Sequence, residues 1–202
     1  MNYLAHLTLS HFSAELQVGN YLADMVKGRA VTQLPPEIYR GILMHRAIDR
    51  LTDADEGVRA VNQRLAERHG RYAPVIGDIA LDYHLYRNWS LLGPPMTFEA
   101  FTQLTYDRLL AAVPLLPPRL GGYIGEMTAG DWLHMYTDRG GLSAVFGRLL
   151  RRLSRPQLLE GVNESLVEHD EQLNRALLGL FPRLQQLAET YRDPTPTDRP
   201  AP

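Results

Sequence analysis

Apolar residues recur at helical spacing along most of this chain, and breakers separate the helical stretches. Each proline pair ends a preceding helix, because proline restricts the residue before it and donates no backbone hydrogen bond. Three such pairs occur, at 35–36, 94–95 and 117–118. Signals of β-strands are scarce: the sequence has no sustained alternation rich in Val, Ile and Thr, and it has no hairpin turn of the Asn-Gly type. The pattern predicts an all-α fold with helices over residues 13–28, 36–52, 54–69, 73–90, 97–113, 120–136, 140–152 and 155–191.

The chain has the length of one ordinary domain. Its 202 residues are 45% hydrophobic, which suffices for a core, and neither an internal repeat nor a linker divides them. We expect a helical bundle over residues 1–192. Pro182 interrupts the last predicted helix, and we expect it to kink or split that helix near Leu180. Residues 193–202 are rich in Pro, Thr and Asp and predict a disordered tail.

The composition excludes several kinds of function. Cysteine is absent, so disulfides, a thiol nucleophile and thiolate metal sites are excluded, and any metal must use His, Asp, Glu or carbonyl oxygen. The net charge of -2 argues against a dedicated nucleic-acid binder. The N-terminal residues do not resemble a signal peptide, and no stretch approaches the ~20 apolar residues of a membrane span. We expect a cytoplasmic protein without a membrane partner.

Polar residues continue the apolar stripe of the helix predicted at 36–52. Ile38, Ile42, His45 and Asp49 are spaced by four, three and four residues, so they share one helix face. A carboxylate buried without a partner is costly. A bound metal ion would compensate it, and so would a hydrogen bond between the two side chains. The pattern leaves both explanations open.

The helix predicted at 73–90 repeats this pattern with two carboxylates. Asp78, Asp82, Leu85 and Trp89 have the same spacing. Like charges one turn apart repel unless a cation lies between them or one carboxylate is protonated. Asp78 follows a glycine, so it could instead cap a helix that begins there. His84 lies off the stripe, and we expect it at the surface or in a wall of the fold.

Two further polar residues occur among apolar neighbours near the N-terminus. His6 follows Leu4 and Ala5, and Asp24 follows Leu22 and Ala23. Joined with the two helices, these segments offer six groups of mixed imidazole and carboxylate type, and we expect most of them to face inward. Such a set suits Mn²⁺, Mg²⁺, Fe²⁺ or Zn²⁺, and a metal held there can activate water and polarise a phosphoryl oxygen. The arrangement resembles all-α phosphohydrolases of the HD type, in which His and Asp on neighbouring helices hold the metal.

Several blocks of sequence carry a more specific resemblance. They are residues 2–7 (NYLAHL), 19–24 (GNYLAD), 41–49 (GILMHRAID), 78–82 (DIALD) with 87–89 (RNW), and 131–133 (DWL). Together they resemble the acyl carrier protein phosphodiesterases, a divergent family related to the HD phosphohydrolases. The resemblance runs from Met1 to about Leu184 and covers nearly the whole chain.

The resemblance implies an activity and a cofactor. Members of the family hydrolyse the phosphodiester that joins 4'-phosphopantetheine to a serine of holo-acyl carrier protein, and they need a divalent cation, typically Mn²⁺, with Mg²⁺ or Fe²⁺ as alternatives. The chain departs from the family at one position. Family members often have His directly after the second Asp of the 78–82 block, whereas this chain has Tyr83 followed by His84. A divergent substrate is one consequence that the departure allows.

With this resemblance, the polar residues receive hypothetical roles. We expect His6, Asp24, His45 and Asp78 to be metal ligands. We expect Asp49 and Asp82 to orient ligating imidazoles or to act as general base. Arg46 follows His45 and could bind a non-bridging phosphate oxygen; a surface arginine paired with a carboxylate is the other interpretation.

The implied partner is a strongly acidic carrier protein, which a basic face would attract. The candidate residues for this face are Arg40, Arg50, Arg148, Arg151, Arg152 and Arg155. A merely solvated helix face is the other interpretation of the arginines. Two other functions remain open at this point: an HD-like phosphohydrolase acting on a nucleotide or other small phosphoester, and a non-catalytic module that binds carrier protein.

Overall fold

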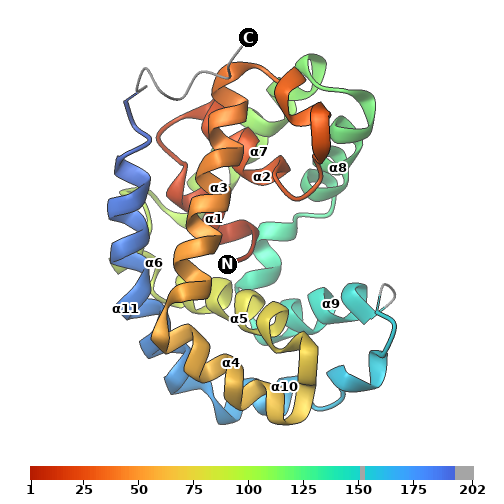
Figure 1. The fold of residues 1–202 in the computed structure, drawn as a ribbon, viewed down its shortest axis with the longest axis vertical. Helices are drawn as coiled ribbons and strands as arrows, with labels where there is room; N and C mark the ends of the chain where they lie inside the picture. Colours follow the sequence, from red (N-terminus) through yellow and green to blue (C-terminus); the bar gives the residue numbers. More distant parts are fainter. Residues whose placement is uncertain (151–152, 194–202) are drawn as a thin grey trace.

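The computed structural model describes residues 1–150 and 153–193, and these are predominantly helical (Figure 1). The prediction of an all-α fold is confirmed, since the described residues contain no strand. The helices are α1 (Tyr3–Leu9), α2 (Ala14–Leu22), α3 (Pro36–Ala54), α4 (Glu56–His69), α5 (Ala73–Arg87), α6 (Trp89–Leu92), α7 (Phe98–Ala112), α8 (Pro118–Ala129), α9 (Arg139–Leu150), α10 (Val162–Glu168) and α11 (Asp170–Glu189). Short 3₁₀ turns join several of them, including η1 (Gly28–Gln33) and η4 (Trp132–Tyr136).

Local sequence signals explain where these helices begin. Helices α3 and α8 start at the second proline of a Pro-Pro pair, where the missing N–H costs nothing. The side chains of Ser13, Asp55 and Thr97 accept hydrogen bonds from the first turns of α2, α4 and α7. None of the described helices is long and apolar enough to cross a bilayer.

The last predicted helix differs from our expectation. The segment divides into the 3₁₀ turn η5 (Pro156–Leu159), α10 and α11, with breaks at residues 160–161 and at His169, and α11 runs through Pro182 without ending near Leu180. A proline inside a helix costs about 3 kcal/mol. The helix tolerates that cost because Leu177, Phe181 and Leu184 are completely buried on the same face. Of the tail predicted at 193–202, only Asp193 is among the described residues.

Helices α2 and α3 pack with their backbones in contact. A Cβ atom on Gly19 would lie 1.9 Å from the carbonyl oxygen of Ile38, and one on Gly41 would lie 2.4 Å from that of Leu16. Only glycine fits at these two positions. This close crossing brings the end of α2 against the middle of α3, the long helix at the centre of Figure 1.

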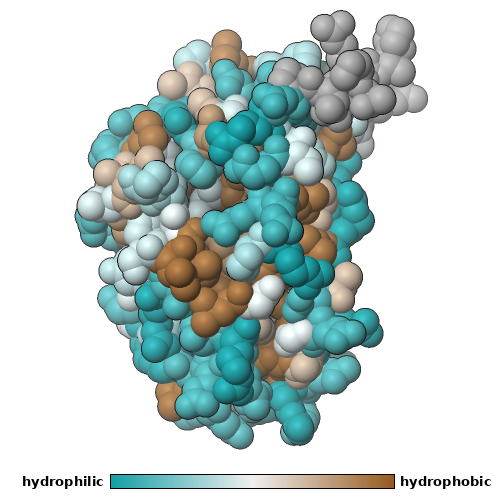
Figure 2. Space-filling view, turned by 90° about the vertical axis from the view of Figure 1, so that its left-hand side faces the viewer, coloured by the Kyte–Doolittle hydropathy of each residue, from teal (hydrophilic) through white to brown (hydrophobic). Residues whose placement is uncertain are grey.

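One face of the molecule exposes hydrophobic side chains. Figure 2 shows the left-hand side of Figure 1, where such side chains gather near the middle of an otherwise hydrophilic surface. The helices labelled on that side of Figure 1 include α6 and α11. Leu91 of α6 is 70% exposed, the largest exposed fraction among the bulky hydrophobic residues that the structure describes.

Candidate metal centre

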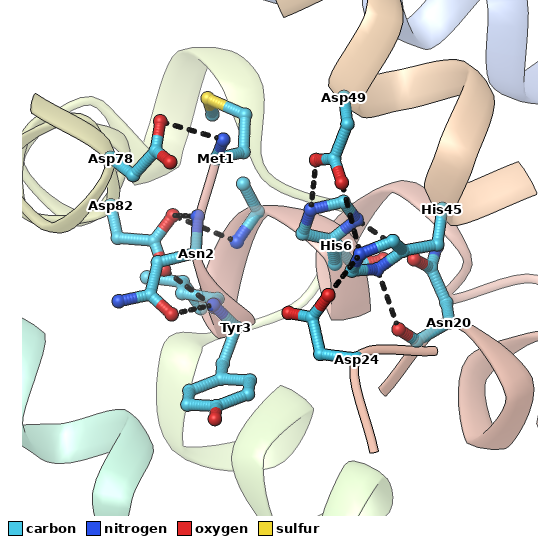
Figure 3. A network of polar contacts seen from close by, with 12 residues as sticks. Met1, Asn2, Tyr3, His6, Asn20, Asp24, His45, Asp49, Asp78 and Asp82 are labelled. Atoms are coloured by element: carbon cyan, nitrogen blue, oxygen red, sulfur yellow. Dashed lines mark hydrogen bonds and ion pairs between the residues drawn. The ribbon is translucent and has the colours of Figure 1, made fainter. Parts of the chain in front are cut away.

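Two histidines and one aspartate from α1 and α3 meet at one point (Figure 3). The carboxylate of Asp49 faces both rings: its Oδ1 lies 3.1 Å from Nε2 of His6, and its Oδ2 lies 3.0 Å from Nε2 of His45. The rings are stacked with their centroids 4.0 Å apart. Both imidazoles are buried, whereas the Asp49 side chain is 40% exposed. The three residues therefore converge on one point beside solvent.

A single buried residue, Asn20 of α2, orients both rings. Its side-chain oxygen is 2.8 Å from Nδ1 of His6, while its side-chain nitrogen donates to the His6 carbonyl oxygen at 3.0 Å. Its own backbone carbonyl oxygen is 2.9 Å from Nδ1 of His45. Carbonyl oxygens only accept hydrogen bonds, so both Nδ1 atoms donate. In the neutral rings, both Nε2 atoms then present lone pairs toward Asp49.

At His6 this geometry places an acceptor against an acceptor. Burial lowers the pKa of His6 to about 4, so at neutral pH its Nε2 carries no proton to share with Asp49. Burial opposes ionisation of Asp49, yet its contacts with His45 and His6 hold the pKa of this carboxyl below its ordinary value. An ionised carboxylate therefore lies 3.1 Å from an imidazole lone pair. A cation between the two groups would convert this repulsion into attraction.

The same arrangement attracts positive charge at His45. Burial disfavours its protonation, but the carboxylates of Asp24 and Asp49 outweigh burial and raise the pKa of His45 to about 9. Its buried Nε2 makes no well-directed hydrogen bond despite the short distance to Asp49. The ligand atoms of His6, His45 and Asp49 all lie within 4.8 Å of one another. Imidazole nitrogen and carboxylate oxygen are donors that divalent transition metals accept, so these residues fit such an ion.

Asp24 lies at the solvent side of this cluster. Its Oδ1 is 3.4 Å from Nε2 of His45, and its side chain is 75% exposed. The neighbouring His45 lowers the pKa of Asp24, so this carboxylate is ionised at neutral pH. The structure thus brings together His6, Asp24, His45 and Asp49 from the set predicted from the sequence.

Asp78 and Asp82 have other partners. Asp82 is completely buried and accepts backbone hydrogen bonds from Asn2, Leu4 and Ala5, at 3.3, 2.7 and 3.2 Å. It therefore satisfies N–H groups at the start of α1, which no intrahelical carbonyl can reach. Asp78 forms an ion pair with the amino group of Met1 at 2.9 Å. The repulsion between the two carboxylates, from which we predicted a ligand and an orienting group, is relieved by contacts with the first residues of the chain. Neither belongs to the group of three that the described residues form.

The other predicted residues divide into three kinds. Arg46, Arg50, Arg148 and Arg155 are exposed, and Arg46 follows His45 on α3. Arg40 is buried, pairs with Glu37 at 2.5 Å and donates to the carbonyl oxygens of Tyr191 and Asp193, so it fastens the C-terminal end of the described chain and does not form part of an exposed basic face. Arg151 and Arg152 lie outside the described residues.

His84 also differs from our expectation. It is 1% exposed and lies in the interior, where its Nε2 is 3.8 Å from Asp170. Burial lowers its pKa to about 4 in spite of that carboxylate. His84 is not a member of the candidate metal-binding group of His6, His45 and Asp49, so it does not supply a further imidazole there.

Asn20 is the site residue that the sequence did not single out. It lies four residues before Asp24 and one after Gly19, in a segment whose polar residues all interrupt apolar neighbours. Apolar residues come shortly before and directly after this asparagine, and that pattern could have indicated a buried side chain with a hydrogen-bonding role. Nothing in its spacing shows that both of its carbonyl oxygens face imidazoles.

Comparison with known proteins identifies the family. The model of the acyl carrier protein phosphodiesterase family matches residues 1–184. The acyl carrier protein phosphodiesterase of Serratia proteamaculans is 33% identical over 189 residues, which cover 94% of this chain and 98% of that protein. The enzyme of the same name from Escherichia coli O45:K1 is 32% identical over 93% of this chain and 97% of its own length. No solved structure matches the chain. The chain belongs to the acyl carrier protein phosphodiesterase family.

Proposed function

We propose that this protein hydrolyses the phosphodiester between 4'-phosphopantetheine and the serine of holo-acyl carrier protein, which gives apo-carrier and 4'-phosphopantetheine. Membership of the family supports the substrate, because its relatives are named for a phosphodiesterase that acts on acyl carrier protein. The observation that supports the chemistry is the pair of imidazole Nε2 atoms that face the Asp49 carboxylate.

His6, His45 and Asp49 are the residues that would hold a divalent cation. We propose Mn²⁺, with Mg²⁺ or Fe²⁺ as the alternatives, because the donors are nitrogen and oxygen. Such a cation supplies Lewis acidity toward a phosphoryl oxygen when bound. Asn20 fixes which nitrogen of each ring faces the cation, and hydrogen bonds of this kind typically support metal affinity.

Asp24 remains our candidate for a fourth ligand. Its Oδ1 is 3.4 Å from Nε2 of His45, a separation that two atoms bound to one cation can have. Because the side chain is exposed, Asp24 can also contact a substrate that arrives from solvent. Arg46 is exposed and directly follows His45 on α3. It is our candidate for a bidentate contact with non-bridging phosphate oxygens.

For Asp78 and Asp82 we propose a supporting role. The three backbone hydrogen bonds to Asp82 fix the beginning of α1, and His6 is one residue beyond the last of them. A shift of α1 would move His6 away from Asp49. These carboxylates therefore position an imidazole through the backbone, and we do not propose that they contact the cation or the substrate.

The substrate's protein part is acidic, and exposed arginines would attract it. Arg50, Arg148 and Arg155 remain candidates for this contact because each is exposed. Charge attraction between exposed groups accelerates encounter more than it strengthens the final complex, and salt screens it. Turnover of the carrier protein should therefore fall as ionic strength rises.

The decisive assay incubates the purified protein with holo-acyl carrier protein and Mn²⁺ and follows the carrier by mass spectrometry. We expect loss of the phosphopantetheine arm, and we expect Asp49→Ala and His45→Ala to abolish it. Asp107→Ala, which removes an exposed carboxylate on α7, is the matched control and should be fully active. Hydrolysis of nucleotides or other small phosphoesters with intact holo-carrier would favour the HD-like alternative. Tight carrier binding without hydrolysis would favour a non-catalytic module.

A further inference from the structure

Two grooves begin beside the candidate metal centre, and they share one wall. Both are lined by Tyr3, Asp24, Glu126 and Trp132. The tyrosine groove, of about 660 Å³, continues along Tyr21 and Tyr123. The second groove, of about 500 Å³, continues between α5 and α9 along Val75, Ile79, Val145 and Leu149. Asp24, which contacts His45, is therefore the point from which both grooves extend.

We propose that the tyrosine groove binds the pantetheine arm of the substrate. This inference rests on the proposed function. If the scissile phosphate lies beside Asp24, the attached arm must extend along a groove that begins there. The arm is an extended chain with a hydroxyl, amides and a terminal thiol, so it needs both apolar contact and hydrogen-bonding partners. Sites for such ligands are mostly apolar and aromatic with a few placed polar groups.

The lining of the tyrosine groove has this mixed character. Tyr3 stands between Tyr21 and Trp132, with ring centroids 5.5 and 6.0 Å away, so the aromatic rings form a continuous wall from Asp24 outward. Figure 3 shows the Tyr3 ring and the Asp24 carboxylate on the same side of the cluster. Leu115, at another part of the lining, is 69% exposed and offers an apolar surface without a partner to cover it.

Polar groups are distributed along the same groove. Its lining includes the side chains of Lys27, Gln33 and Arg119, which can donate hydrogen bonds to amide or hydroxyl oxygens. Beyond the shared wall, the second groove adds the aliphatic side chains Val75, Ile79, Val145 and Leu149, and Arg148 is its only cationic side chain among the described residues. A chain that carries amides fits the tyrosine groove better, because amide groups placed against these four aliphatic side chains would lose hydrogen bonds to water.

The chain offers a built-in reporter for the test. Lys27 is the only lysine in the sequence, and it lines the tyrosine groove. Reductive methylation with ¹³C-formaldehyde would therefore place one side-chain label in the groove, and the Lys27→Arg variant would distinguish its NMR signal from that of the terminal amine. We expect pantetheine and 4'-phosphopantetheine to shift the Lys27 signal and inorganic phosphate to leave it in place. An unmoved signal at saturating 4'-phosphopantetheine would overturn the assignment, and so would an equal shift with inorganic phosphate.

Kinetics with holo-carrier give a second, independent test. Ala30→Trp places a bulky ring in the tyrosine groove and removes no polar side-chain group, and Val145→Trp does the same in the second groove. We expect Ala30→Trp to raise KM for holo-carrier by about tenfold or more, because the indole ring would occupy the groove and the pantetheine arm would lose its contacts there. Ala60→Trp, on the exposed face of α4, is the matched control, and thermal melting verifies that each variant is folded.

The outcomes separate this inference from the proposed function. An increase in KM confined to Val145→Trp would place the arm in the second groove and overturn the inference while the proposed function stands. An unaltered KM in Ala30→Trp would do the same. Wild-type protein that leaves holo-carrier intact would instead refute the proposed function, whatever the NMR titration shows. The titration needs no turnover, so it reports on the groove alone.

Discussion

Replacing Asn20 with alanine tests whether one residue sets the chemistry of both imidazoles. The variant loses the side-chain oxygen that accepts from His6 Nδ1 and the nitrogen that donates to the His6 carbonyl oxygen. It keeps the backbone carbonyl that accepts from His45 Nδ1. His6 should therefore lose its fixed orientation while His45 retains it, which makes His45 an internal control.

The size of the effect follows from burial. Asn20 is completely buried, so the orphaned Nδ1 of His6 cannot turn to water, whereas the His6 carbonyl oxygen still accepts from the Ser10 hydroxyl at 2.8 Å. Leaving one buried donor unsatisfied costs about 1–3 kcal/mol, so the free energy of unfolding should fall by about 1–3 kcal/mol. Removing a residue that orients a ligating histidine typically weakens metal binding by about 10–100-fold, and we expect a Mn²⁺ affinity reduced by that factor.

Gln17→Ala is the matched control for the loss of stability. Gln17 lies on the same helix, is 1% exposed, and donates to the Leu7 carbonyl oxygen and to Thr105 Oγ1 at 3.0 and 3.1 Å. It contacts neither histidine. Urea unfolding should show a similar loss of stability in both variants, while chelator competition should show weakened Mn²⁺ binding only in Asn20→Ala. Equal Mn²⁺ affinities in the two variants would refute the reasoning, and ¹⁵N shifts of the imidazoles would show whether His6 had changed its tautomer.

Three further predictions concern the stability of the fold and the association of the protein with its carrier substrate. Gly19→Ala should unfold the protein or destabilise it severely, because its Cβ would lie 1.9 Å from the Ile38 carbonyl oxygen. The control is Gly179→Ala in α11, where a Cβ meets nothing within 4 Å. In thermal or urea unfolding this control should be neutral or stabilising by up to about 1 kcal/mol. The folded pKa of His84 is lowered to about 4 from 6.5, so its contribution to stability is complete above pH 6.5 and is lost as pH falls toward 4. His84→Gln should therefore have a flatter stability profile than wild type across this range, by about 1.4 kcal/mol per pH unit at most, and parallel profiles would contradict the burial of a neutral ring. Arg148→Ala should reduce kcat/KM for holo-carrier at low ionic strength and approach wild type in high salt, since salt screens exposed charges; a deficit that persists in high salt would exclude steering as its role.

The sequence was sufficient to predict the helical class and to single out four residues that the fold brings together, His6, Asp24, His45 and Asp49. Helical periodicity and the proline pairs located most of the helices, because these signals act within a few residues. The spacing of His45 and Asp49 on one stripe predicted their joint contact, which needs only the geometry of a single helix. The family resemblance was confirmed over residues 1–184.

What the sequence could not show depends on contacts between distant segments. The same stripe argument applied to Asp78 and Asp82, but their compensation comes from the first residues of the chain, about eighty positions away. Arg40 was predicted to belong to a basic surface, but in the fold it donates hydrogen bonds to the carbonyl oxygens of Tyr191 and Asp193, near the C-terminal end of the described chain. Asn20 acquires its role only where α1, α2 and α3 meet, since its hydrogen bonds join α2 both to α1 and to α3.

His6, His45 and Asp49 are proposed to form a cation site, on which the proposed chemistry depends. Titrating metal-stripped protein with Mn²⁺, while the EPR signal of the free ion is followed, measures this directly. We expect saturable binding by wild type and by Asp107→Ala, and an affinity weakened by at least about tenfold in Asp49→Ala. If Asp49→Ala binds Mn²⁺ as tightly as wild type, the cluster is not the metal centre.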